Sequence, residues 1–232
     1  MTRIALALTC FERMDPHSEA GFLALAISLG RLSPEVETTP FVRHGMTCAD
    51  ACNQIMEDVE GRELATGQRF DRVLWMDDDV SLQSEDIQKL LTSVDTEHPV
   101  VFALAFYRTR PYLPSMWTYT RSTLADGVLS PCKTTRILTW PKDTLVLVHG
   151  AGLCVALLDR NVFDTISKPY FTWIEGGYKR TPCTPDGFLC AKLNKAGIPI
   201  YCHTGVRTRH VGFPEMVDEE LATTFRNEWE TT

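Results

Sequence analysis

The chain has 232 residues, which is enough for one α/β domain with a well-buried core, and no change in composition divides it in two. Apolar residues make up 44% of it and charged residues 23%, a composition typical of globular proteins. The formal net charge of −7 argues against a dedicated nucleic-acid binder, and no apolar run reaches the roughly 18 to 20 residues that a membrane-spanning helix needs.

The N-terminus and the cysteines both indicate a cytoplasmic protein. Residues Ile4–Leu8 are apolar, but the run is too short for a signal peptide and fits a buried strand better. The eight cysteines form no C-x-x-C pair, so we expect free, mostly buried thiols and neither a disulfide framework nor a zinc site.

The first third of the chain alternates strand and helix patterns. Arg3–Thr9 is predicted as a buried strand and Ser18–Leu32 as a helix; Val36–Val42 alternates like a second strand, and Ala49–Glu63 is predicted as a second helix. This alternation predicts an α/β fold.

An acidic triplet follows the next predicted strand. Arg72–Met76 is a short apolar run that ends in Asp77, Asp78 and Asp79, and a helix is predicted from Ser84. Adjacent carboxylates repel unless cations or hydrogen bonds compensate them, and Mg²⁺ or Mn²⁺ prefers such hard oxygen ligands. The alternative is an exposed acidic turn that also caps the next helix.

The remaining predicted elements complete an α/β domain. A glycine-containing segment, His149–Gly152, lies between two apolar runs, where it either admits a ligand close to the backbone or makes a tight strand connection. The elements are strands at Val100–Phe106, Leu145–Val148, Leu153–Leu158 and Ile198–Cys202 and a helix at Asp186–Ala196.

The last residues, Pro214–Thr232, are polar and acidic and are predicted to be helical. Met216, Leu221, Phe225 and Trp229 form a possible apolar docking stripe. We therefore divide the chain into a main domain, residues 1–213, and a tail, residues 214–232, that packs on the domain or closes it.

Two further polar residues are placed where an α/β sheet binds ligands, at the carboxyl ends of its strands. Asp186 opens a predicted helix, and His210 follows a late strand. Asp186 could instead serve only as a helix cap, and His210 could be an ordinary packed histidine.

Three motifs, in order along residues 1–213, carry a family resemblance. The segment Val73–Asp79 resembles the D-x-D segment of glycosyltransferases with the GT-A fold. The segment Asp186–Gly197 is similar to the E-D-x-x-L-x-x-R-L-x-x-x-G segment of family 2-like enzymes, and His210–Gly212 is similar to the terminal H-x-G of small phage and bacterial members.

The resemblance implies a single GT-A (Rossmann-like) domain with a mostly parallel mixed sheet flanked by helices. It also implies that Asp77, Asp79 and His210 bind Mn²⁺ or Mg²⁺, that Asp186 is the catalytic base of an inverting reaction, and that a nucleoside-diphosphate sugar, with UDP as the first choice, is the donor. The donor-binding residues expected on this basis are Thr9, Asp77, Asp78, Gly150, Gly152, Arg207 and Arg209. The two arginines could equally be solvated surface charges.

Three departures from the family pattern leave the nucleotide open. Pro185 replaces the usual first acid, Lys192 replaces the usual arginine, and the segment Asp50–Asn53 lacks the arginine that many relatives carry before the asparagine.

The sequence thus predicts a glycosyltransferase that acts on an acceptor hydroxyl. The acceptor could be a hydroxymethylated pyrimidine in phage DNA, a saccharide or a protein, with Trp173 and Glu175 as a possible acceptor platform. The alternatives are a nucleotidyltransferase or phosphohydrolase, although Thr9–Arg13 lacks the glycine-rich loop common there, and a non-catalytic sugar-nucleotide-binding protein. The oligomeric state is left open.

Overall fold

The computed structural model describes residues 1–10, 35–121, 124–125, 128–129, 133–174, 183–211 and 216–229. The helix predicted at Ser18–Leu32 lies outside these ranges. In the part of the chain that is described, no helix is both long and apolar enough to cross a bilayer. The six cysteines with described side chains form no disulfide, and four of them are buried, as the sequence predicts.

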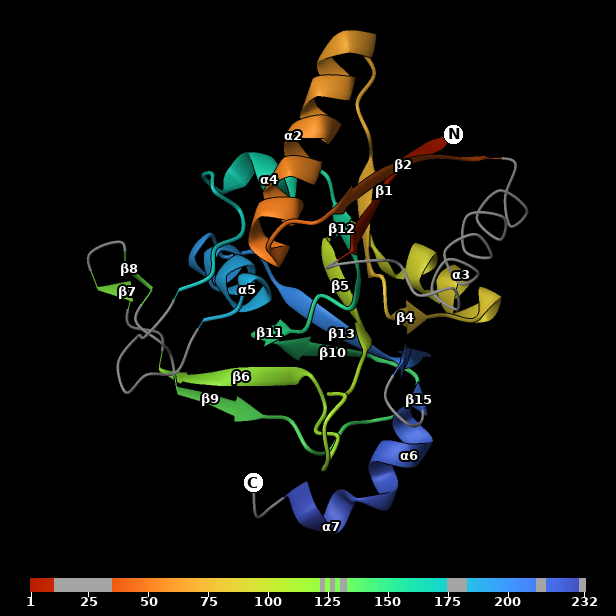
Figure 1. Cartoon of the computed structure of the whole chain (residues 1–232), viewed down its shortest axis with the longest axis vertical. Coiled ribbons are helices and arrows are strands. Elements are labelled where there is room, and N and C mark those ends of the chain that lie inside the picture. The colour runs from red at the N-terminus through yellow and green to blue at the C-terminus, as the bar shows by residue number, and fades with distance from the viewer. Residues whose placement is uncertain are drawn as a thin grey trace.

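A seven-stranded sheet forms the centre of the fold, with the strand order β10-β13-β5-β12-β3-β1-β2 (Figure 1). All seven strands lie where the sequence predicts apolar strands, although β13 continues to Arg207. Their bounds are β1 Thr2–Cys10, β2 Val36–His44, β3 Arg72–Asp77, β5 Val100–Leu104, β10 Leu145–Val148, β12 Val155–Asp159 and β13 Ile200–Arg207.

Five of the seven strands run in the same direction. β1 pairs in parallel with both β2 and β3, and β13 pairs in parallel with β5. β12, between β3 and β5, and β10, at the edge, run the opposite way. The sheet is therefore mixed and mostly parallel, which confirms the predicted fold class. The carboxyl ends of β1, β3 and β5 lie along one side of the sheet, which we call its carboxyl edge, and β12 begins there.

Three helices match their predicted positions closely: α2 Cys48–Thr66, α3 Ser84–Ser93 and α5 Pro185–Lys195. The side chain of Thr47 caps α2 by accepting a hydrogen bond from the Asp50 amide at 3.2 Å. A short helix, α4 Val162–Thr165, follows β12 and was not predicted, because four residues are too few to show helical periodicity.

Alternate strand residues feed two separate apolar layers, because successive side chains point to opposite faces of a sheet. In Figure 1, α2 and α5 lie to the left of the central sheet and α3 to its right. The left layer joins strand residues such as Trp75 and Phe102 to Met56 of α2 and Leu189 of α5. The right layer joins strand residues such as Leu74, Met76 and Val101 to Ile87 and Leu90 of α3.

The segment between β5 and β10 holds strands that the sequence analysis did not predict. β6 Met116–Arg121 pairs with β9 Lys133–Arg136 and with β11 Gly150–Ala151, and β7 Leu124–Ala125 pairs with β8 Val128–Leu129. β6 and β9 are rich in polar residues, so they lack the apolar run on which the prediction depends.

The C-terminal tail is only partly helical, which corrects the prediction. Its first described residues form β15 Met216–Val217, which pairs with β14 Arg209–Val211; β14 in turn pairs with β4 Val80–Ser81. The short helices α6 Glu219–Thr224 and α7 Arg226–Trp229 follow. Backbone pairing with β14 stabilises Met216 and Val217 as a strand, and this outweighs the weak helical preference of these two residues. Trp229 is 3% exposed, and its indole N–H donates to the Pro111 carbonyl at 2.9 Å.

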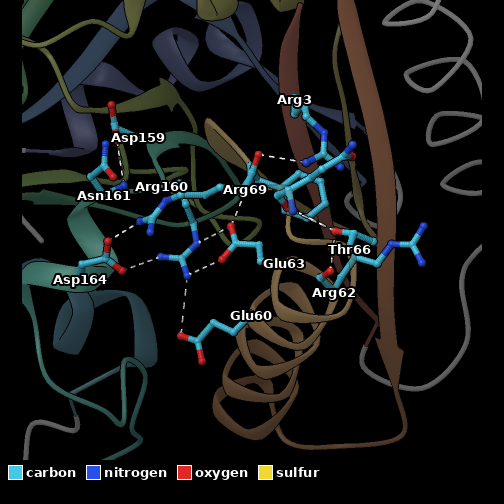
Figure 2. Close-up of polar contacts among 12 residues, drawn as sticks. Arg3, Glu60, Arg62, Glu63, Thr66, Arg69, Asp159, Arg160, Asn161 and Asp164 are labelled. Carbon is cyan, nitrogen blue, oxygen red and sulfur yellow. Dashed lines mark hydrogen bonds and ion pairs between the residues drawn. The ribbon is translucent and has the colours of Figure 1, made fainter.

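A buried arginine ties the end of α2 to the β12–α4 connection (Figure 2). Arg160 is 3% exposed, and its guanidinium donates to both carboxylate oxygens of Glu63, at 2.9 and 3.2 Å, and to Asp164 at 3.1 Å. Glu63 also accepts a hydrogen bond from the Phe70 amide at 3.0 Å. The buried charge is therefore fully paired, which a buried guanidinium requires.

Replacing Arg160 by methionine is expected to lower the free energy of unfolding by about 3–5 kcal/mol, because Glu63 would keep its charge without a partner. Urea denaturation measures this change. Arg69→Met, which removes the exposed partner of Asp164, is the matched control and is expected to cost less than about 1 kcal/mol. Equal losses in the two variants would contradict the assignment.

Candidate active site

The acidic triplet borders a pocket of about 220 Å³ at the carboxyl end of β3. Thr9 of β1 lies directly opposite Asp77 in the parallel register, and its hydroxyl donates to Asp77 Oδ1 at 3.1 Å. The register of two buried strands therefore fixes this carboxylate. The pocket is lined by Thr9, Met46, Cys48, Ala51, Asp77, Asp78, Asp79 and Arg108.

His210 reaches the same place from a distant part of the sequence. β4 follows the acidic triplet directly and pairs with β14, so that His210 lies opposite Val80. The imidazole is 8% exposed, and its Nε2 lies 3.2 Å from Asp79 Oδ1. Two of the three predicted metal ligands, Asp79 and His210, are thus in contact, and Asp77 lies two residues before Asp79 in the chain.

The hydrogen bonds of His210 suit a metal ligand. Its Nδ1 lies 2.9 Å from the Phe106 carbonyl oxygen, which can only accept, so Nδ1 carries the proton. In the neutral ring, Nε2 then presents a lone pair to Asp79, and two acceptors face each other. A proton or a cation must lie between them. Donation of the second ring nitrogen to a carbonyl is the usual support of a metal-binding histidine.

The pKa values in the pocket also indicate a place for a cation. Burial and the neighbouring charge of Asp79 raise the pKa of Asp77 well above its usual range, against the hydrogen bond from Thr9. Burial opposes ionisation of Asp79, but the hydrogen bond and charge of His210 and the charge of Arg108 lower its pKa overall. A divalent cation would stabilise both carboxylates in their charged form.

The donor set fits Mn²⁺ or Mg²⁺, although its members are not gathered into a finished site. Among the described residues, no group of three or more histidine, cysteine, aspartate or glutamate side chains is arranged to hold a metal. Arg108 Nη1 lies 2.6 Å from Asp79 Oδ2, so a guanidinium supplies the positive charge beside Asp79.

Asp186 lies on the other side of a three-residue segment, Gly152–Cys154, that bonds to the backbone of Asp77 and to the carboxylate of Asp186. A hydrogen bond from the Leu153 backbone reaches the Asp186 carboxylate, and the carbonyl of the next residue, Cys154, accepts from the Asp77 amide at 2.9 Å. The charges of Asp77, Asp79 and Asp186 all act on the buried Cys154 thiol and, with burial as the main cause, raise its pKa. Asp186 therefore lies near the acidic triplet, but it is not among the residues that line the pocket.

The helix-cap alternative for Asp186 is wrong, because the N-cap residue of α5 is Thr184, whose hydroxyl accepts a hydrogen bond from the Gly187 amide at 3.4 Å. Asp186 lies in the first turn of α5, where its Oδ1 accepts a hydrogen bond from the Gly187 amide at 2.9 Å. Burial raises the pKa of the carboxyl group, against hydrogen bonds from Thr184 and from the backbone. A raised pKa makes the carboxylate a stronger base.

The two glycines singled out in the sequence have different surroundings. A β-carbon on Gly152 would lie 2.3 Å from Ser115 Oγ and 3.7 Å from Asp186 Oδ2, so this glycine lies beside the predicted base. A β-carbon on Gly150 would lie 2.6 Å from the Trp117 ring, so Gly150 makes room for a buried indole. Neither residue is among those that line the acidic pocket.

Arg207 and Arg209 do not join this site. They line a separate groove of about 820 Å³, where Arg207 pairs with Glu219 at 3.0 Å and Arg209 with Asp218 at 3.8 Å. Because residues alternate along β14, Arg209 points away from the side that His210 occupies. The structure thus supports the alternative that Arg207 and Arg209 are solvated surface charges.

The departures from the family pattern have structural consequences. Pro185 is the first residue of α5, where a missing amide proton costs nothing. Lys192 donates to the carbonyl of Pro169 at 2.7 Å. Asn53 accepts hydrogen bonds from the amides of Tyr170 and Phe171 and donates to the Phe171 carbonyl. These side chains organise the segment after α4. Trp173 is 51% exposed, whereas Glu175 and Gly212 lie outside the described residues.

Arg108 is a charged pocket-lining residue that the sequence analysis missed. It stands in a loop without a recognisable motif, so no spacing marks it. One signal was present: it follows the predicted strand Val100–Phe106 by two residues, and that strand ends at the same edge of the sheet as Asp77.

Comparisons with known proteins bear on the fold. No protein-family model matches the sequence, and no curated protein matches it either. The crystal structure of protein A197 from STIV is similar, with a TM-score of 0.52 and 15% identity over 91% of this chain and 86% of that one. This similarity supports the fold alone.

Glycosyltransferases are also among the structural neighbours, at lower scores. A mutant Drosophila β-1,4-galactosyltransferase 7 in complex with manganese, UDP-Gal and xylobiose has a TM-score of 0.44 and 12% identity over 89% of this chain and 68% of that one. A glycosyltransferase involved in glycosylation of the major capsid of PBCV-1 has a TM-score of 0.35 and 9% identity over 69% and 61%. These scores are too low to transfer an activity.

Gly152→Ala is expected to lower the free energy of unfolding by about 1–3 kcal/mol, because the new methyl group would collide with Ser115 Oγ. Ser115→Ala removes that atom and leaves Ser115 Cβ as the nearest neighbour, at 3.3 Å. The double variant should therefore be more stable than the sum of the single effects predicts. Urea denaturation of all four proteins measures the coupling, and strict additivity would contradict this packing.

Proposed function

We propose that this protein is a metal-dependent glycosyltransferase that moves a sugar from a nucleoside-diphosphate sugar, with UDP as the first candidate nucleotide, to an acceptor hydroxyl. One observation carries the proposal. Asp77 and Asp79 line a pocket at the carboxyl end of β3, His210 contacts Asp79, and the Gly152–Cys154 segment lies between Asp77 and a further carboxylate, Asp186. The low-scoring similarity to glycosyltransferases agrees with it but does not support it independently.

The residues around the pocket divide between binding and positioning. Asp77, Asp79 and His210 would hold Mn²⁺ or Mg²⁺, which as a Lewis acid stabilises the charge that develops on the leaving diphosphate. Thr9 fixes Asp77 by its hydrogen bond, and the Phe106 carbonyl fixes the tautomer of His210. Asp78 also lines the pocket and is assigned to donor binding.

Asp186 is assigned the role of general base. Its carboxylate takes the proton of the acceptor hydroxyl as that oxygen attacks the anomeric carbon, while the bond from the anomeric carbon to the diphosphate oxygen breaks and the diphosphate leaves with the electron pair. Attack from the face opposite the leaving group inverts the anomeric configuration. The raised pKa of Asp186 favours proton uptake in this step.

The acceptor is defined by its hydroxyl group. A hydroxymethylated pyrimidine in DNA, a saccharide and a protein hydroxyl each meet this requirement, and a panel of the three with one donor distinguishes them. The exposed indole of Trp173 offers a flat apolar face for a sugar ring or a base.

Calorimetric titration with nucleoside diphosphates, with Mn²⁺ and with a chelator, tests the donor site. We expect one nucleotide to bind only when Mn²⁺ is present, and Asp79→Asn to weaken Mn²⁺ binding by about tenfold or more, since it removes a ligand charge. Asp95→Asn is the control, because Asp95 is an exposed carboxylate in the turn after α3. If no nucleotide binds under any condition, the proposal fails.

Asp186→Asn is expected to reduce sugar transfer by about 10²- to 10⁴-fold and to leave donor affinity within about twofold of wild type, since only the proton acceptor is lost. Initial rates and a parallel nucleotide titration separate the two effects. Glu85→Gln, an exposed acid in the first turn of α3, is the matched control. Unchanged turnover in Asp186→Asn would remove this residue from catalysis.

A further inference from the structure

Arg108 stands on a loop whose backbone is held firmly. Phe106 and Pro114 form a β-bridge, the Tyr107 amide donates to the Leu113 carbonyl at 3.0 Å, and the Tyr112 amide donates to the Thr109 carbonyl at 2.9 Å. The Arg108 side chain, in contrast, is 56% exposed. The guanidinium can therefore change partners by side-chain rotation alone, without any movement of the backbone.

The neighbouring side chains of this loop are committed elsewhere. Arg110 donates from Nε to Glu228 at 3.1 Å and lies 4.5 Å from the centre of the Phe225 ring. Tyr107 stacks under Arg136, with 4.4 Å between guanidinium carbon and ring centre. Arg108 points instead into the acidic pocket, to Asp79.

The charges around the pocket are unbalanced. Its described lining contains the carboxylates of Asp77, Asp78 and Asp79, and Arg108 is the single lysine or arginine among those lining residues. A diphosphate carries further negative charge, so these carboxylates repel it until cations offset them. A divalent metal offsets part of this charge, and a guanidinium is the protein group best shaped to bind the rest, since its parallel N–H donors match phosphate oxygens.

We propose that Arg108 exchanges partners when the donor binds: Asp79 holds its guanidinium in the free protein, a divalent cation displaces it from Asp79, and the released guanidinium then binds the donor diphosphate. The inference deepens the proposed function and depends on it. Arg108 would be both a competitor of the metal and a ligand of the nucleotide.

The contact distances make this exchange reasonable. Asp79 uses Oδ2 for Arg108, at 2.6 Å, and Oδ1 for His210, at 3.2 Å, so a cation bound to Asp79 must compete with the guanidinium for its charge. Because the Arg108 side chain is 56% exposed and that of Asp79 23%, solvent reaches the guanidinium side of the ion pair and lowers the cost of breaking it. Once the cation is bound, like charges repel and favour rotation of Arg108 toward the phosphates.

Two titrations on Arg108→Ala test the exchange. Calorimetry with Mn²⁺ alone should show roughly twofold to fivefold tighter binding than wild type, because the competing cation is gone. Calorimetry with UDP at saturating Mn²⁺ should show roughly 10- to 100-fold weaker binding, because a charge-assisted phosphate contact is lost. These opposite changes are not expected from a residue that only supports the loop.

Two further variants complete the test. Arg110→Ala, in the same loop but directed at the C-terminal helix, should leave both affinities unchanged. Arg108→Lys keeps the positive charge but loses the two parallel N–H donors of the guanidinium. Its Mn²⁺ affinity should stay close to that of wild type, while its UDP affinity should fall between those of wild type and Arg108→Ala.

The failures can be told apart. If wild-type protein binds no nucleotide with any metal, the proposed function and this inference both fall. If wild type binds UDP in a Mn²⁺-dependent manner but Arg108→Ala weakens both titrations, or changes neither, only the role of Arg108 is overturned.

Discussion

Repulsion between carboxylates at the end of β3 is the constraint around which the site is organised. Asp77 and Asp79 are two residues apart on a turn that follows a buried strand, and each raises the cost of charging the other. The groups that reduce this cost come from three separate parts of the chain: Thr9 at the end of β1, Arg108 after β5 and His210 on β14. The sheet topology brings all three to one edge.

The reversed strand β12 explains how Asp186 joins them. Because β12 runs antiparallel to β3 and β5, it begins where those strands end, and the buried residues just before it lie beside the site. Those residues, Gly152 to Cys154, contribute backbone groups and no large polar side chain. They bind the Asp77 amide on one side and support the Asp186 carboxylate on the other. A parallel strand at this position would have placed its start at the opposite edge.

Much of this arrangement follows from sequence patterns, and the exceptions have physical causes. The seven core strands and α2, α3 and α5 were predicted because each shows an apolar run or an alternating or helical pattern of apolar residues. β6 and β9 were missed because they are polar, and the strand at Met216–Val217 was missed because its stability comes from pairing with β14. The acidic triplet after an apolar strand pointed to Asp77 and Asp79, and the start of a predicted helix, together with the family resemblance, pointed to Asp186. These patterns could not show that Arg209 turns away from His210 or that Arg108 pairs with Asp79, since those facts depend on register and loop geometry.

The side chains of α7, the last described helix, attach it to the loop that carries Arg108. Glu228 pairs with Arg110, and the Trp229 indole binds the carbonyl of Pro111, so the last two residues of α7 are attached to residues within three positions of Arg108. The indole of Trp229 also stacks on Trp140, with ring centres 6.1 Å apart. An affinity tag or fluorophore attached near α7 is therefore expected to disturb the loop that carries Arg108, whereas a label at the exposed Leu64 lies at the opposite end of α2 from Cys48, which lines the pocket.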